Sequence, residues 1–151
     1  MTRQLDGADL ILDCTDNLET RRVINAHSIE SKVPFIFCTA QGTTGMTYVV
    51  DPRLRERACF ACVFDRLRTF AQPAQTGVLG TTVRVAASLQ VAEALKLLLG
   101  KRYTEGLVSF NAWDLRLETF RMRKNPACAV CGKGEQGKSG KKTKTKEKKK
   151  R

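Results

Sequence analysis

Four cysteines at paired spacing are the residues with the clearest chemical potential in this 151-residue sequence. Cys59 and Cys62 form one Cys-x-x-Cys pair, and Cys128 and Cys131 form a second. Four thiolates are the ligand set of a tetrahedral structural zinc site. Because 65 residues separate the pairs, the spacing leaves open one shared zinc site, separate redox pairs or plain buried thiols. A shared zinc would be structural, since four sulfur ligands leave no coordination position for water or substrate.

Two aspartates form a second candidate site. Asp13 and Asp16 follow the apolar run at residues 8–12, at the carboxyl end of an expected strand, where open α/β sheets bind their ligands. A carboxylate there could hold Mg²⁺ on a nucleotide, since Mg²⁺ binds through one or two carboxylates together with phosphates. Asp16 also fits the N-cap of a helix, because Glu19 follows it at capping-box spacing. The two roles do not exclude each other.

A unit of strand, helix and strand is expected to position these aspartates. Residues 8–14 and 35–38 are short apolar runs that predict buried strands, and a helix is expected from Asp16 to about Lys32. A crossover of about twenty residues requires parallel pairing, with both faces of the sheet covered. The expected buried residues of this unit are apolar side chains of the helix and two thiols in or beside the strands, namely Leu18, Val23, Ile24, Ile29, Cys14 and Cys38.

The remaining expected elements follow in order along the chain. The first are a strand at 46–50, an irregular region at 53–76 and a helix at 78–99. A hairpin with strands at 107–113 and 117–122 and a cysteine knuckle at 125–132 follow. The helix over 78–99 has apolar residues on more than one face, which predicts a core helix, and Gly100 stands where a helix-ending glycine belongs. The fold class predicted from these elements is α/β.

The charge of the chain is concentrated at one end. Of the formal net charge of +12, +8 falls in residues 133–151, which contain no apolar residue able to anchor a core. We therefore expect a domain over residues 1–132 and a disordered Lys-rich tail over 133–151. The tail could contact the phosphates of nucleic acid or of anionic lipid, but it has no aromatic residue to stack on bases, and a solvated tail is the alternative.

The sequence also bears on cellular location. No run of 18 or more apolar residues is present, which excludes a membrane-spanning helix, and the amino-terminal residues lack the apolar segment of a signal peptide. Six cysteines without a secretory signal are typical of a reducing compartment. A cytoplasmic location is therefore expected.

Five motifs in order resemble the ThiF/MoeB/HesA family, the bacterial and archaeal relatives of ubiquitin-activating enzymes. They are Asp-Leu-Ile-Leu-Asp-Cys-Thr-Asp-Asn at 9–17, Cys-Phe-Ala-Cys at 59–62, Gly-Val-Leu-Gly at 77–80, Glu-Ala-Leu-Lys at 93–96 and Cys-Ala-Val-Cys-Gly at 128–132. The resemblance covers about residues 5–132. It implies part of a doubly wound, Rossmann-like nucleotide-binding sheet with a C-terminal hairpin and a zinc knuckle of four cysteines.

The resemblance also implies an activity and roles for particular residues. Members of the family adenylate the C-terminal glycine of a ubiquitin-like sulfur carrier with ATP and Mg²⁺, for thiamine, molybdopterin or tRNA sulfur chemistry. The second aspartate of the family's Asp-Cys-Thr-Asp-Asn motif helps to hold the magnesium nucleotide, and it corresponds here to Asp16, with Asn17 beside it. The family's zinc ligands correspond to the four cysteines at 59, 62, 128 and 131.

This sequence departs from the family in two places. Before the aspartate motif, family members carry a glycine-rich phosphate loop, an acidic ribose contact and basic groups for the triphosphate, none of which is in this sequence. Thioester-forming members have a cysteine shortly before the Gly-Val-Leu-Gly motif, whereas residues 70–76 contain none. The chain therefore resembles the C-terminal half of the family's domain, and adenylation without a cysteine nucleophile is the most it would perform.

Two functions follow as hypotheses. In the first, a truncated or split adenylating enzyme works only with a complementing N-terminal half, and self-associates through a homodimer surface like that of the family. In the second, a zinc-stabilised scaffold without catalysis binds a ubiquitin-like protein or, through its basic tail, nucleic acid. The missing basic groups weigh on the first hypothesis, because they stabilise the charge that develops in the transition state.

Overall fold

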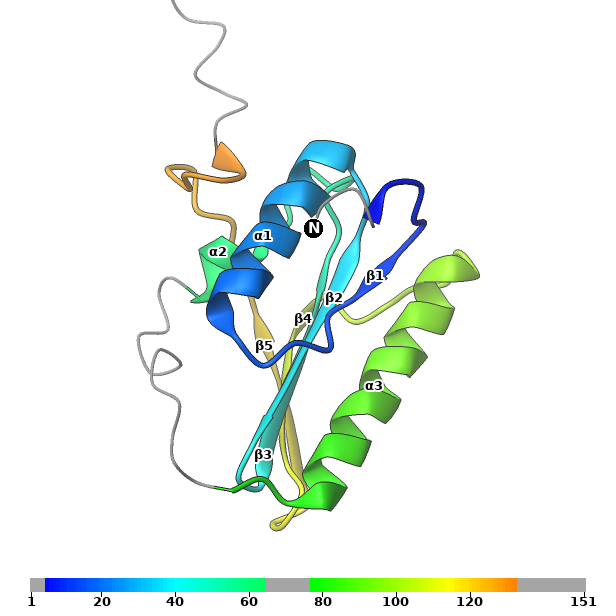
Figure 1. The fold of residues 1–151 in the computed structure, drawn as a ribbon, viewed down its shortest axis with the longest axis vertical. Coiled ribbons are helices and arrows are strands. Elements are labelled where there is room, and N and C mark those ends of the chain that lie inside the picture. The colour runs from blue at the N-terminus through cyan, green and yellow to red at the C-terminus, as the bar shows by residue number, and fades with distance from the viewer. Residues whose placement is uncertain (1–4, 65–76, 133–151) are drawn as a thin grey trace, which may run out of the picture.

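The computed structural model of the chain describes residues 5–64 and 77–132. In these segments five strands form one sheet in the order β1 (Ile11–Leu12), β2 (Phe35–Gln41), β3 (Thr44–Val50), β4 (Gly106–Asn111) and β5 (Arg116–Arg121). Helices α1 (Leu18–Ser31) and α2 (Phe60–Phe64) lie on one side of the sheet, and α3 (Gly80–Leu98) lies on the other (Figure 1). This mixed α/β architecture is consistent with a Rossmann-like fold.

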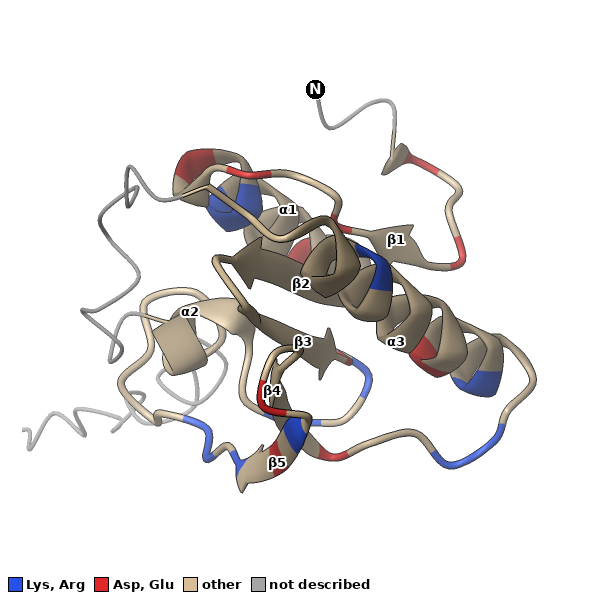
Figure 2. Cartoon of the chain, turned by 90° about the horizontal axis from the view of Figure 1, so that it is seen from below, with Lys and Arg blue, Asp and Glu red and all other residues tan. Residues whose placement is uncertain are grey.

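The expected parallel unit is present, although its first strand is short. β1 pairs with β2 in parallel, with Ile11 opposite Phe35, and α1 makes the crossover. The predicted strand at 8–14 is reduced to two residues. Asp13 still donates its N–H to the carbonyl of Ile36 on β2, and the chain then turns, with the Asp13 carboxylate accepting hydrogen bonds from the backbone and the hydroxyl of Thr15. The other neighbouring strands pair antiparallel, so the sheet is mixed. Charged residues are missing from β2 and β3 but present on the edge strand β5 (Figure 2).

Helix α1 begins one residue later than the capping-box pattern predicts. The N-cap is Asn17, whose side-chain oxygen accepts the Thr20 N–H at 2.8 Å, so the prediction of Asp16 as the cap is wrong. Among the expected core residues of α1, Ile24 is buried and Val23 is exposed. The rest of the buried face is polar, and consists of Arg21, Asn25 and Ser28.

Aromatic side chains fill the space between the sheet and α1 and α2. The rings of Phe60 and Phe64 stack with their centroids 4.4 Å apart, and Phe37 on β2 lies 5.2 Å from Phe60 and 4.5 Å from Phe64. Helix α2 lies in the region expected to be irregular. It is helical for five residues because all of its side chains are buried in this cluster.

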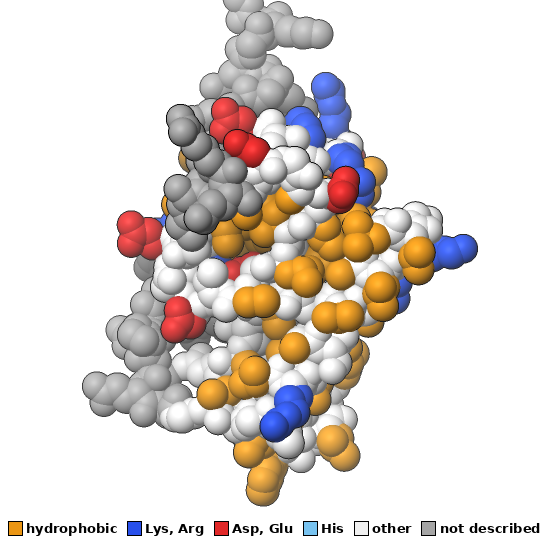
Figure 3. Space-filling model, turned by 45° about the vertical axis from the view of Figure 1, so that its right-hand side comes forward, with side chains coloured by type: hydrophobic (Ala, Val, Ile, Leu, Met, Phe, Trp, Pro, Cys, Tyr) orange, Lys and Arg blue, Asp and Glu red, His pale blue; other side chains and the backbone are white. Residues whose placement is uncertain are grey.

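Helix α3 covers the opposite face of the sheet, against β2 and β3, but it does not have the predicted environment of a core helix. Its buried residues are mostly small or polar, and include Thr82, Ala86, Gln90 and Glu93. Apolar side chains form an exposed stripe along one flank of the helix, made of Val83, Ala87, Val91, Leu95 and Leu98. Figure 3 shows hydrophobic side chains gathered on this side of the molecule. The predicted glycine end is confirmed, since Gly100 has a φ of +62°.

The hairpin of β4 and β5 also forms as expected, with both strands beginning one residue earlier than predicted. Every residue of β5 is exposed. In the part of the chain that the structure describes, no helix is long and apolar enough to cross a membrane.

Candidate functional site

The two cysteine pairs converge at one end of the α1/α2 side. Cys59 directly precedes α2 and Cys62 lies within it, and the knuckle that follows β5 brings Cys128 and Cys131 against them, with all four Sγ atoms within 4.8 Å of one another. The distances are 3.8 Å for Cys59 to Cys62, 3.7 Å for Cys59 to Cys128 and 3.4 Å for Cys62 to Cys131. Tetrahedral zinc with Zn–S bonds of about 2.3 Å requires sulfurs about 3.8 Å apart. The donor set and its spacing therefore fit one shared zinc ion.

Hydrogen bonds fold the knuckle around this cluster. The N–H of Asn125 points at Cys62 Sγ at 3.4 Å, and the N–H of Gly132 donates to the carbonyl of Cys128. Burial raises the pKa of the Cys59 thiol and raises that of Cys131 to about 11. Burial also acts to raise the pKa of Cys128, but N–H groups of Cys131 and Val130 outweigh it and lower the pKa to about 7. A bound cation would favour the thiolate form of Cys59 and Cys131, which burial disfavours.

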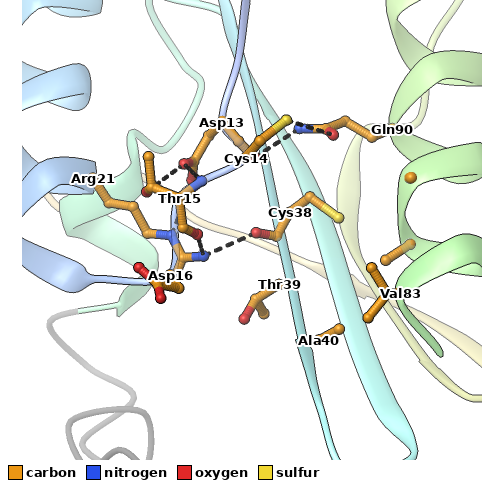
Figure 4. A pocket seen from close by; sticks show the side chains of 12 residues that line it. Asp13, Cys14, Thr15, Asp16, Arg21, Cys38, Thr39, Ala40, Val83 and Gln90 are labelled. Carbon is orange, nitrogen blue, oxygen red and sulfur yellow. Dashed lines mark hydrogen bonds and ion pairs between the residues drawn. The ribbon is translucent and has the colours of Figure 1, made fainter. Parts of the chain in front are cut away.

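A cavity of about 300 Å³ lies where β1 ends, between β2 and α3. It is lined by Asp13, Cys14, Thr15, Asp16, Arg21, Cys38, Thr39, Ala40, Val83, Ala86, Ala87 and Gln90. The polar groups of the turn between β1 and α1, with Arg21 of α1, lie on one side of this pocket and α3 lies on the other (Figure 4). The position agrees with the sequence-based expectation that ligand-binding groups gather at the carboxyl end of the first strand.

The two predicted aspartates have different environments in this pocket. Asp13 is fully buried, and its carboxylate accepts a hydrogen bond from Arg21 Nε at 3.0 Å. Arg21 Nη2 also donates to the carbonyls of Thr15 and Cys38. Asp13 therefore braces the turn before α1, and both oxygens of its carboxylate already accept hydrogen bonds.

Asp16 lies at the exposed rim of the same pocket. It lines the cavity beside Arg21 (Figure 4), and it makes no hydrogen bond or ion pair with the described residues. Asn17 is exposed and its side-chain oxygen is used in the N-cap, which leaves only the amide NH₂ group for a ligand. A cofactor-binding role for these two residues remains a prediction.

Two pocket residues have a different environment from the one predicted, and a third was not predicted at all. Cys14 and Cys38, expected in the core, are exposed and half-buried respectively and line the pocket, because the chain turns away after β1. Burial and the neighbouring Asp13 carboxylate raise the pKa of Cys38 to about 11. Gln90 on α3 had no role in the predictions, yet its Nε2 donates to the carbonyls of Asp13 at 3.0 Å and Ile36 at 2.8 Å. It ties α3 to both parallel strands.

Comparison with known proteins identifies the relationship. The family model described as ThiF family matches residues 1–130. The chain belongs to the ThiF family. Molybdopterin-synthase adenylyltransferase of Salmonella typhimurium is 35% identical over 138 residues, a match that covers 87% of this chain and 54% of that protein. Sulfur carrier protein ThiS adenylyltransferase of Escherichia coli is 35% identical over 127 residues, covering 83% of this chain and 50% of that protein.

Two solved structures are similar to the chain in fold. The crystal structure of Escherichia coli MccB with ATP superposes with a TM-score of 0.70 at 15% identity, over 86% of this chain and 41% of that chain. The heterocyclase TruD superposes with a TM-score of 0.66 at 18% identity, over 84% of this chain and 23% of that chain. The chain thus spans about half the length of the curated relatives given above. The expected basic tail at 133–151 and the cysteine-free segment at 70–76 lie outside the described residues.

Proposed function

We propose that this chain supplies one part of an ATP-dependent adenylation site that activates the C-terminal carboxylate of a ubiquitin-like sulfur carrier. The observation that carries the proposal is the pocket at the end of β1, where Asp16 is an accessible carboxylate beside the amino terminus of α1. The proposal is supported by the names of the relatives, which include a molybdopterin-synthase adenylyltransferase and a ThiS adenylyltransferase. ATP, when bound, would supply the adenylyl group that is joined to the carrier's carboxylate as pyrophosphate leaves.

Each pocket residue has a task in this proposal. Asp16 would hold the magnesium-bound nucleotide, and the amino terminus of α1 would favour its anionic phosphates. The pair of Asp13 and Arg21 would keep the turn that carries Asp16 in place. Ala86 and Ala87 of α3 would give the opposite wall a shallow apolar surface, because their side chains are small.

The described part of the pocket lacks a positive charge that is free to meet a triphosphate. Arg21 is the one cation that lines it, and its guanidinium is held by Asp13 and two backbone carbonyls. Adenylation would therefore need basic groups from a complementing segment or a second chain. The outer edge of β1 and the exposed stripe of α3 are the surfaces against which such a segment or a second copy would pack.

Zinc is the metal that we assign to the four-cysteine centre. Cys59, Cys62, Cys128 and Cys131 would hold it, and their spacing supports a closed tetrahedral site. Its contribution would be structural, because it joins α2 to the knuckle after β5, two segments that are far apart in the sequence.

Calorimetric titration of the zinc-loaded chain with ATP and Mg²⁺ tests the role of Asp16. Asp16→Ala should weaken binding by about tenfold or more. Asp9→Ala, which removes an exposed carboxylate at the other end of β1, should leave binding unchanged. Equal binding by the wild type and Asp16→Ala would remove Asp16 from the site.

Exchange of labelled pyrophosphate into ATP tests adenylation itself. The chain is mixed with a sulfur carrier and with the part of the Escherichia coli ThiS adenylyltransferase that it does not match. We expect exchange only when all three proteins are present. Failure with this and every other family pairing, in folded samples, would overturn adenylation and favour a scaffold that binds the carrier without activating it.

A further inference from the structure

Helix α1 carries a buried asparagine that points at the four-cysteine centre. Asn25 is 1% exposed, and its Nδ2 lies 3.8 Å from the Sγ of Cys59. A buried amide in the middle of a helix is costly unless both of its ends have partners. The side-chain oxygen of Asn25 therefore needs a partner as well as its NH₂ group.

The second contact fixes which way the amide faces. Asn25 Oδ1 accepts the N–H of Phe60 at 3.0 Å. Phe60 is the first residue of α2, so this N–H has no acceptor within its own helix. Since the oxygen is used there, the NH₂ group faces Cys59, and it can only donate.

A donor in this position distinguishes the metal-loaded centre from the metal-free one. Four thiolates around a divalent cation leave excess negative charge on the sulfurs, and an N–H that donates to a charged acceptor makes a stronger hydrogen bond than one that faces a neutral thiol. Partners of this kind orient metal ligands, and their loss costs about 10- to 100-fold in metal affinity. Asn25 is therefore placed to favour the loaded state.

The same face of α1 reaches the pocket one turn earlier. Arg21 precedes Asn25 by four residues, so the two side chains project from the same side of the helix. Arg21 holds the Asp13 carboxylate at 3.0 Å and the carbonyl of Cys38 at 3.0 Å. A shift or rotation of α1 that released Asn25 from Cys59 would also move the guanidinium that braces the pocket.

We propose that Asn25 is a positioning residue that couples the metal state of the four-cysteine centre to the pocket. It donates to the metal-bound sulfur of Cys59 and thereby holds α1, and with it Arg21, in place against the Asp13 turn. The inference rests on the metal site assigned under the proposed function, and it adds a residue and a coupling to that site.

Two variants of the full-length chain test the coupling. Asn25→Asp keeps an oxygen for the Phe60 N–H but replaces the donor facing Cys59 with an acceptor. Ser28→Ala is the matched control, because it removes a different buried hydrogen bond of α1, the one from Ser28 to the carbonyl of Val33. Asn25→Ala, which removes both contacts, replaces Asn25→Asp as the test variant if Asn25→Asp does not fold.

Metal affinity and spectra give the first result. In competition with a chromophoric chelator, Asn25→Asp should bind zinc about 10- to 100-fold more weakly than the wild type, and Ser28→Ala should not. With Co²⁺ in place of Zn²⁺, the thiolate-to-cobalt absorption bands should shift in Asn25→Asp only. Equal affinities and spectra for Asn25→Asp and Ser28→Ala would overturn the proposal.

Hydrogen exchange over residues 13–21 gives the second result. Exchange should become faster when zinc is removed from the wild type, and equally fast in zinc-loaded Asn25→Asp, while zinc-loaded Ser28→Ala keeps the wild-type protection. Unchanged exchange in both cases would overturn the coupling. A wild-type chain that binds no zinc would instead refute the metal site itself, which separates failure of the proposed function from failure of this inference.

Discussion

The two faces of the sheet are built in opposite ways. Under α1 and α2, fifteen buried apolar residues form one cluster that includes the aromatic rings and three of the four metal-site cysteines. Between the sheet and α3, the corresponding cluster has four buried residues, Ile36, Val49, Ala94 and Leu97. The first face has the composition of a complete core, whereas the second has little apolar area buried within the described residues.

The difference continues in the orientation of the helices. Helix α3 buries Gln90 and Glu93 together with small apolar residues and leaves large apolar side chains exposed, unlike an ordinary surface helix. The inward polar residues are satisfied, since Gln90 binds two strand carbonyls and Glu93 binds Lys96 and Thr104. The α1/α2 face therefore buries most of the apolar side chains of the described core, and the α3 face leaves apolar surface exposed.

The largest expected effect is the loss of the metal centre. Cys59→Ser should abolish stoichiometric zinc binding and lower the temperature of the thermal transition by the largest amount, because the binding free energy of a structural zinc is also folding free energy. Zinc content and thermal unfolding monitored by circular dichroism check this. Cys14→Ser, at an exposed thiol outside the centre, is the control and should keep the bound zinc and the wild-type transition temperature. A zinc-free Cys59→Ser variant with an unchanged transition temperature would show that the aromatic cluster suffices without metal.

The next largest effect is expected for a large apolar side chain of the α1/α2 face, compared with one of the α3 face. Phe60→Ala should destabilise the chain by about 3–5 kcal/mol, since Phe60 is buried against three other rings. Leu95→Ala, in the exposed stripe of α3, should change the free energy of unfolding by less than about 0.5 kcal/mol. Urea unfolding of both variants measures the difference. Similar losses for the two would mean that a partner already covers the stripe in solution.

The same contrast explains what the sequence could predict. The parallel unit of β1, α1 and β2 was predictable because short apolar runs flank a helix of suitable length before Pro34. Helix α3 was predicted as a helix but not in its environment, since apolar residues on several faces give no direction for burial. Alternation along β2 does show two faces, because Phe35 and Phe37 point to one side and Ile36 to the other.

Only some of the site residues and their contacts could be predicted from the sequence. The pattern of four cysteines was visible, but only the fold brings Cys59 and Cys128 to 3.7 Å. Asp16 was found through its motif, whereas Arg21 and Gln90 were missed because single polar residues inside helices look like solvent-facing positions. An arginine and an asparagine four residues apart, on a helix with few apolar residues, was the one available signal that α1 buries polar groups.

The smallest effect concerns the polar anchor of the α3 face. Burial alone would raise the pKa of Glu93, but hydrogen bonds from Lys96 and from the backbone and hydroxyl of Thr104 outweigh it and hold the pKa below its usual range. Because the folded-state pKa is lowered, this contribution to stability is present above the unfolded-state pKa and is lost as pH falls through the folded one. The contribution of Glu93 to stability is therefore lost below about pH 4.

Glu93→Gln should therefore cost about 1–2 kcal/mol at neutral pH, the size of a charged hydrogen bond, and the gap to the wild type should close as pH falls below about 4. Glu118→Gln, on the exposed strand β5, should alter neither the stability nor its pH dependence. Urea unfolding between about pH 2.5 and 7 measures both. A Glu93→Gln deficit that persists unchanged at low pH would mean that this residue acts through packing, and the α3 face would then resemble the α1/α2 face more closely than its polar interior indicates.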